Sequence, residues 1–376
     1  MVGVFSFPAL LPSFVAEWSL TGAEAGWISG ATFAGYALAV PFLAALTDRV
    51  NAKLVYLAGA LFAAVSVMGF ALAADGFWTA FAWRLLGGVG LAGTYMPGLK
   101  ALMDRTSGAR QPRWISYYTA SFSLGTSGSF LMTGAMAGAF GWRAAFGLAA
   151  ATAAAAFLLV AFILPSVRPV PPEHKNNPFD FGEVLRNRAA MAYVFGYSSH
   201  TWELFGARSW MVAFLSWVLA SQPGASGPSP TAVATIGALL AMVASVVGAD
   251  MAVRFDRRRL CILAMLGSGA LAAVIGFCSG LPYGAVAALM LLYSMLIQVD
   301  SAALTTGALL AAAPDRRGAT LSVHSLLGFS AGLIGPLAFG IVLDRAGGAN
   351  TGLAWGLAFA SLGAVAALGP LALRRR

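Results

Sequence analysis

Residues 27–73 read WISGATFAGYALAVPFLAALTDRVNAKLVYLAGALFAAVSVMGFALA. Two long runs in this stretch, Trp27 to Leu46 and Leu54 to Ala73, carry no charged residue and flank a short polar loop. An α-helix needs about 20 apolar residues to cross the roughly 30 Å hydrocarbon core of a bilayer. The stretch therefore predicts two membrane-spanning helices joined by a tight, charged turn.

The composition extends this prediction to the whole chain. Of the 376 residues, 59% are apolar and 10% are charged, whereas roughly 25% of the residues of a soluble domain are charged. The apolar runs between polar segments predict twelve spans, at approximately 2–16, 25–46, 53–74, 77–102, 113–139, 143–164, 188–219, 231–251, 260–279, 283–311, 319–343 and 351–372.

One polar segment divides these spans six and six. Residues 165–181 read PSVRPVPPEHKNNPFDF and hold five of the 17 prolines, so they cannot form a helix. We expect an N-terminal bundle at 1–164, a cytoplasmic linker at 165–187 and a C-terminal bundle at 188–376.

A weak internal repeat supports that division. AALTDRVNAK at 44–53 corresponds to ADMAVRFDRR at 249–258, an offset of 205 residues. Arg110, Gly125 and Gly128 match Arg317, Gly332 and Gly335 at an offset of 207. Two nearly equal offsets across the linker indicate duplicated halves.

The basic residues predict the orientation. With both termini in the cytoplasm, all but four of the 23 Lys and Arg residues fall in cytoplasmic segments, the exceptions being Arg84, Arg143, Arg208 and Arg345. The net charge of +9 then suits anionic lipid rather than nucleic acid. The richness in alanine and arginine suggests a bacterial inner membrane, and we expect a monomer.

No sequence pattern indicates an enzyme, a metal site or a cofactor. No serine, histidine and acid arrangement supplies a nucleophile with its base, and neither metal-ligand spacing nor a phosphate-binding glycine loop occurs. A receptor without transport activity would need an appended soluble domain or a long tail, and the chain shows neither.

Three motifs resemble those of the major facilitator superfamily. AALTDRVNAK is similar to the G-x-L-A-D-R-x-G-R-K loop between helices two and three, with Asp48, Arg49 and Lys53 in register, although Ala44, Asn51 and Ala52 depart from it. RLLGGVGLAG at 84–93 resembles the helix-four motif, and GWRAAF at 141–146 resembles the entry to helix six.

This resemblance implies a fold and a mechanism. The expected fold is all-α, with twelve transmembrane helices in two pseudo-symmetric six-helix bundles. The bundles would rock about a midplane site and expose it to each side in turn. The loop would act as a gate latch through Asp48, Arg49 and Lys53. Its second copy keeps Arg254 but has Val253 where the acid should be.

The motifs also bear on the substrate. TYMPGLKALMDR at 94–105 is most similar to cyanate-permease-type and other organic-anion members. Residues 127–134 read SGSFLMTG in place of the G-P pair of many drug antiporters, and helix two lacks the arginine of nitrate porters. We predict a proton-coupled symporter for a small anionic solute; the alternative is a proton-driven exporter of drugs or amphipathic metabolites.

Ionisable residues inside spans are costly and are therefore candidates for function. In SSHTWELFGARSW at 198–210, His200 and Glu203 lie about 60° apart and Arg208 about 80° from His200 on a helix, so all three can face one cavity. Glu203 would take up a proton with His200 as relay, and Arg208 would anchor a substrate anion. The alternative is a structural Glu–Arg or Glu–His pair.

Other candidates lie on further spans. Asp300 and His324 are expected to join the proton pathway, or else to make structural hydrogen bonds. Arg84 is expected to act as a substrate or relay cation, or as a donor to backbone carbonyls. The cavity wall would take aromatic residues, each with packing or an interface belt as its alternative; the candidates are Phe7, Tyr36, Tyr95, Tyr117, Tyr197 and Trp202.

Overall fold

The computed structural model describes residues 1–106, 111–167, 181–313 and 316–374, and within these ranges the secondary structure is helical without strands. The first half of the chain contains α1 (Ser6–Ala9), α2 (Leu11–Trp18), α3 (Gly22–Leu46), α4 (Ala52–Ala73), α5 (Phe77–Met103) and α6 (Gln111–Ile163).

The second half contains α7 (Gly182–Arg186), α8 (Arg188–Ala220), α9 (Pro230–Arg254), α10 (Arg257–Ile275), the 3₁₀ helix η2 (Gly276–Gly280), α11 (Tyr283–Gln298), α12 (Ser301–Ala311), α13 (Arg317–Arg345), α14 (Gly352–Ala366) and α15 (Gly369–Arg374). The short helix α7 falls inside the predicted linker and was not expected there. Residues 168–180 of that linker lie outside the described residues.

The first predicted span, 2–16, is two short helices rather than one. Helix α1 ends at Ala9, and α2 begins at Leu11 with a proline in its first turn, Pro12. Proline lacks the N–H that an unbroken helix would bond at this point, so the helix restarts there. Helix α2 ends at Trp18, and its C-cap residue, Ser19, has a φ of +50°.

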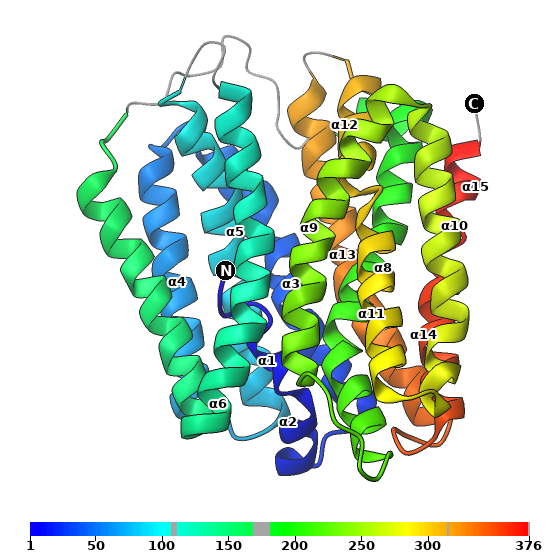
Figure 1. Ribbon diagram of the computed structural model, residues 1–376. Coiled ribbons are helices and arrows are strands. Elements are labelled where there is room, and N and C mark those ends of the chain that lie inside the picture. Colours follow the sequence, from blue (N-terminus) through cyan, green and yellow to red (C-terminus); the bar gives the residue numbers. More distant parts are fainter. Residues whose placement is uncertain (107–110, 168–180, 314–315, 375–376) are drawn as a thin grey trace.

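Helix α6 contains the two predicted spans 113–139 and 143–164. Its backbone leaves the helical conformation at Gly141, where φ is +82°, a value that glycine adopts without strain. An added Cβ there would meet no atom within 4 Å, so the conformation rather than the space requires glycine. The chain reverses direction at the lower end of α6 in Figure 1.

The predicted span 283–311 is also interrupted. Helix α11 ends at Gln298 and α12 begins at Ser301, so that Asp300 stands at the N-cap position of α12. The sequence did not indicate this break, because no proline or glycine marks it.

Eight of the described helices are long and apolar enough to cross a membrane. Two further long helices, α5 with 27 residues and α8 with 33, do not meet that standard. These two carry the buried Arg84 and the buried His200, Glu203 and Arg208. The other ionisable candidates, Asp300 and His324, lie in segments that do meet it.

The helices pack in two groups that meet along α3 and α13. Helix α5 packs against α3 and α4, and α4 also packs against α6; α8 packs against α12, α13 and α14. In Figure 1 helices α4 to α6 lie on the left and α8 to α15 on the right. Helices α3 with α13, and α6 with α9, join the groups.

The contact between α3 and α13 brings two backbones together. A Cβ on Gly26 would lie 2.5 Å from the carbonyl oxygen of Pro336, and a Cβ on Gly30 would lie 2.6 Å from that of Leu333. Glycine at every fourth position allows such close approach. We call the end that holds Gly22 and Asp344 the Asp344 end, and the opposite end, which holds Lys53, the Lys53 end.

Candidate substrate and proton sites

The three ionisable residues of α8 are all buried, and each meets a different partner. The Nδ1 of His200 lies 2.8 Å from Oδ1 of Asp300. The hydroxyl of Ser268, on α10, donates to Oε2 of Glu203 over 2.8 Å. Different helices supply these partners, and a cavity shared by all three residues stays a prediction.

The His200–Asp300 pair is among the most deeply buried ionic contacts of the described residues. Both side chains are at most 3% exposed. The break between α11 and α12 sets the carboxylate at the start of a helix, where a negative charge is favoured. His200 Nε2 has no hydrogen-bond partner among the described residues. Protonation of this pair would therefore change a buried charge with little local compensation.

Glu203 points into the second half of the chain, toward α10. Its second carboxylate oxygen, Oε1, lacks a hydrogen-bond partner among the described residues. Tyr293, on α11, lies within electrostatic reach of the carboxylate, although its hydroxyl does not reach hydrogen-bond geometry. Glu203 thus stands apart from the His200–Asp300 pair, although it interacts electrostatically with Asp300.

His324 contacts α12 and α8. Its Nε2 lies 3.2 Å from the hydroxyl of Thr305 on α12, and its ring stacks on Tyr197 at 3.8 Å between centroids. No hydrogen bond joins it to Asp300 among the described contacts.

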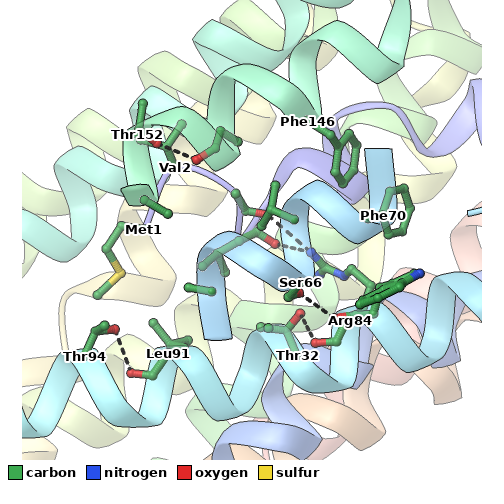
Figure 2. A pocket seen from close by; sticks show the side chains of 18 residues that line it. Met1, Val2, Thr32, Ser66, Phe70, Arg84, Leu91, Thr94, Phe146 and Thr152 are labelled. Atoms are coloured by element: carbon green, nitrogen blue, oxygen red, sulfur yellow. Dashed lines mark hydrogen bonds between the residues drawn. The ribbon is translucent and has the colours of Figure 1, made fainter. Parts of the chain in front are cut away.

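Arg84 donates to backbone carbonyls, as its structural alternative predicts. Its guanidinium donates to the carbonyls of Gly3, Val4, Ile28 and Ser29 over 2.7–3.5 Å. It borders a cavity of about 60 Å³ built from the first half of the chain. Figure 2 shows Arg84 on the floor of that cavity beside Ser66 and Thr32, with its bonds directed at backbone oxygens.

Arg208 has far fewer bonds. One hydrogen bond is described, from Nη2 to Oε1 of Gln298 at 3.4 Å, and the guanidinium carbon lies 5.8 Å from the centre of the Phe5 ring. Arg208 borders a small cavity of about 10 Å³ among α6, α8, α9 and α11. This arginine therefore stands where the two halves of the chain meet.

The aromatic candidates fall into different settings. Tyr36 is fully buried and stacks on Phe329 of α13 at 3.9 Å, next to the pair formed by Phe33 and Phe205. The hydroxyl of Tyr36 and the indole N–H of Trp202 have no partner among the described residues. Tyr197 is the residue that stacks on His324.

The remaining aromatic candidates have three different settings. Tyr95 stacks on Tyr118, whose hydroxyl donates to the Tyr95 carbonyl. Phe7 is fully buried and stacks on Phe14 at 5.0 Å. Tyr117 is 53% exposed beside Trp114, a setting that fits the surface alternative.

The predicted gate residues are at the Lys53 end. Asp48 and Arg49 are exposed, and the described part of the chain gives their side chains no ion pair. The ammonium of Lys53 donates to the carbonyls of Ala161 and Leu164 at the end of α6 over 2.8 and 2.7 Å. Lysine here stabilises the last turn of that helix.

The second copy of the gate motif is paired within its own helix. Arg254 Nε lies 2.9 Å from Oδ2 of Asp250, one turn away in α9, and both side chains are more than half exposed. No cluster of three or more His, Cys, Asp or Glu side chains suited to a metal occurs in the described ranges.

Several contributors to these contacts were missed from the sequence. Ser268 lies in the small-residue run GSGA, Tyr293 in an apolar run, and Phe205 and Phe329 look like ordinary lipid-facing or core residues. Gln298 offered a signal, since an amide inside an apolar span needs a partner. The others had none, because contact with a distant helix leaves no mark on local sequence.

These features define a class of protein: a multi-pass helical membrane protein with charged residues buried between its helices. The sequence matches the profile of the Major Facilitator Superfamily over residues 1–336, and the chain belongs to that family. The relatives named below are transporters rather than enzymes.

Curated relatives match parts of the chain. The niacin transporter NiaP of Acinetobacter baylyi is 28% identical over 144 residues, 38% of this chain and 32% of its own length. The gentisate transporter of Corynebacterium glutamicum is 25% identical over 181 residues, 46% of this chain and 40% of its own. A probable sphingolipid transporter of Arabidopsis thaliana, spinster homolog 1, is 27% identical over 148 residues, 39% of this chain and 30% of its own. The matched segment thus spans 30–40% of each of these relatives.

Solved structures match over nearly the full chain. A bacterial homologue of the human lysosomal transporter Spinster, inward-facing and occupied, has a TM-score of 0.75 and 17% identity, and the match covers 99% of this chain and 91% of that one. A mutant of the nucleoside transporter NupG has a TM-score of 0.75 and 16% identity, with 100% and 97% covered. These likenesses establish the fold.

Proposed function

We propose that this protein is a secondary active transporter that moves a small organic anion across the membrane by alternating access, driven by protons. The observation that carries the proposal is Arg208, a buried cation with one long hydrogen bond at the junction of the two halves. Burying a charge without partners is strongly unfavourable. A carboxylate on the substrate would supply the missing acceptors in the bidentate geometry that arginine favours.

The architecture proposed with this function is the full family fold. Twelve spans form a bundle at 1–164 and a bundle at 188–376, and the cytoplasmic linker joins them. Both termini face the cytoplasm of a bacterial inner membrane, the Asp344 end faces outward, and the protein works as a monomer in contact with anionic lipid. The distribution of basic residues and the packing of α3 on α13 and of α6 on α9 support this arrangement.

The proton site proposed is the His200–Asp300 pair. An imidazole and a carboxylate 2.8 Å apart in a buried setting can exchange between charged and neutral forms, and each form favours a different packing of the surrounding helices. Glu203 and His324 would tune this pair from neighbouring positions, since both lie within electrostatic reach of one of its members.

The substrate class proposed is a small carboxylate with an aromatic ring. Two curated relatives are named for niacin and gentisate, and both compounds are aromatic acids. Phe5 lies over the Arg208 guanidinium, and Tyr36, Tyr197 and Trp202 would supply further ring contacts.

The gate proposed is at the Lys53 end. Its exposed residues, Asp48, Arg49 and Arg254, would form ion pairs across that end only when it closes. Lys53 would stay bonded to α6 throughout.

A second function has support of its own. A relative is named a probable sphingolipid transporter, so export of amphipathic compounds is the alternative. It requires a wide cavity lined by aromatic residues. The buried guanidinium of Arg208, with its one described hydrogen bond, favours the small anion instead.

The test is uptake by proteoliposomes. Purified protein would be reconstituted, an inward pH gradient imposed, and radiolabelled niacin, gentisate, uridine and sphingosine offered separately. The proposal expects uptake of an aromatic acid that collapses with a protonophore and is absent in Arg208→Gln. Uptake of sphingosine alone, or acid uptake that Arg208→Gln leaves intact, would overturn it.

A further inference from the structure

Helix α3 begins with a complete set of partners for its backbone N–H groups. The first N–H groups of any helix lack partners within the helix. Thr21 and Glu24 form a capping box, in which the Thr21 side chain accepts from the Glu24 N–H and the Glu24 carboxylate accepts from the Thr21 N–H. Only the N–H groups of Gly22 and Ala23 remain.

Asp344 takes both remaining groups from the other half of the chain. Gly22 N–H donates to Oδ1 over 2.7 Å, and Ala23 N–H donates to Oδ2 over 2.8 Å. The residues are more than 320 positions apart in the sequence. One carboxylate of α13 thus completes the N-terminus of α3.

The Asp344 carboxylate is stabilised by α3 and not by its own helix. It lies in the last turn of α13, where a negative charge is unfavourable for its own helix, because the C-terminal end of a helix is already negative. The N-terminal end of α3 is positive and offsets that penalty. The two helix ends are held together by charge as well as by hydrogen bonds.

The backbones of α3 and α13 pack closely next to Asp344. The Asp344 carboxylate must therefore leave Gly22 and Ala23 before the two helices separate. A Cβ on Gly340 would lie 2.0 Å from the carbonyl oxygen of Gly22, so the two backbones touch one turn below the carboxylate. The contact continues through Gly26 and Gly30 to the stacked rings of Tyr36 and Phe329. Past these rings Leu38 and Phe42 of α3 are about two-thirds exposed.

We propose that Asp344 is a latch that holds the Asp344 end closed, and that the carboxylate must leave Gly22 and Ala23 each time this end opens. The latch rests on the proposed function, since it needs a protein that opens at alternate ends. Released N–H groups would bond to water because the contact is solvent-exposed. Opening therefore exchanges two charge-assisted hydrogen bonds for bonds to water and leaves no buried N–H group without a partner.

The test measures the distance across the Asp344 end. Spin labels would be attached at Gly138→Cys on α6 and Gly284→Cys on α11, where an added Cβ meets no atom within 4 Å, in a background in which Cys261 and Cys278 are alanine. Double electron–electron resonance then reports open and closed populations. Asp344→Ala should raise the open-to-closed ratio about fivefold or more, since it removes two charge-assisted hydrogen bonds, and Asp344→Asn should raise it less.

The matched control is Glu24→Ala, which removes the other carboxylate at the same helix end. Its contacts lie within residues 21–24, so it should leave the distance distribution unchanged. The latch is overturned if monodisperse Asp344→Ala and Asp344→Asn keep the wild-type distribution, or if Glu24→Ala shifts it equally. Uptake measured in parallel separates the two proposals: a shifted distribution without transport of any probe would sink the transport proposal and leave the latch standing.

Discussion

The two buried arginines of the long polar helices, Arg84 on α5 and Arg208 on α8, look alike by position. Both are less than 10% exposed, and each lies about 6 Å from a phenylalanine ring. Their hydrogen bonds differ. Arg84 donates to four backbone carbonyls, and Arg208 makes one long bond to a side chain. Under the proposed function, unused donor capacity rather than burial distinguishes the arginine that binds the anion from the one that stabilises the fold.

The largest effect is expected at Arg208. Arg208→Gln removes the proposed anchor of the substrate anion, and truncating one partner of a buried charged contact costs about 2–5 kcal/mol, roughly 30- to 5000-fold in affinity. We expect uptake to fall by about that factor while the melting temperature stays within a few degrees of wild type. Initial rates in proteoliposomes and a thermal melt check this; intact uptake with a lowered melting temperature would reverse the roles of the two arginines.

At Arg84 the expected loss is one of stability. Arg84→Gln leaves buried carbonyls of Gly3, Val4, Ile28 and Ser29 without their donor, and each orphaned group costs about 1–3 kcal/mol. The melting temperature should drop by about 10 °C or more, and the protein that remains folded should keep its wild-type KM. A changed KM at unchanged stability would place Arg84 among the substrate-binding residues.

A smaller effect on rate but a clear one on coupling is expected at Asp300. Asp300→Asn removes the carboxylate of the buried pair, so the gradient should no longer drive accumulation, which should fall about tenfold. Exchange of labelled for unlabelled substrate should persist. The change on the partner side, His200→Gln, serves as the matched variant. Full accumulation in both variants would exclude the pair as the coupling site.

Glu203 gives the smallest expected change. Its carboxylate bonds to Ser268 within the second half and makes no described hydrogen bond to Arg208, His200 or Asp300. Glu203→Gln preserves that hydrogen bond through the amide oxygen, so accumulation should fall no more than about twofold. Ser268→Ala is the control, since it removes the same bond from the other side. A loss as large as that of Asp300→Asn would move the proton site to Glu203.

The sequence was a good guide to the spans and to the family. Charge-free runs and the loop at 44–53 depend on local composition, and local composition is what hydropathy and motifs measure. The α helices at 22–46, 52–73 and 317–345 lie close to the predicted ranges for that reason. The break at Leu10 was missed although Pro12 marks it locally. The break at Val299–Asp300 was missed because no proline or glycine marks it, and tertiary packing overrides a continuous apolar run there.

The contacts of the candidate site were harder to predict from the sequence. A helical wheel gives the direction of His200, Glu203 and Arg208 but not the helix that each one meets. The role of Arg84 depends on carbonyls more than 50 positions away, and every residue type carries a carbonyl. Asp344 escaped notice for the same reason, since its partners are backbone N–H groups with no signature of their own.

The bare backbone contact between α3 and α13 has a practical consequence for capturing this protein in a single shape. No side chain separates the two helices here, so even one added methyl group causes a steric clash. Alanine at Gly26 would collide with Pro336 and Leu337 and force the helix ends apart. The contact between α3 and α13 therefore offers crystallographers a way to trap the opposite conformation with one small substitution.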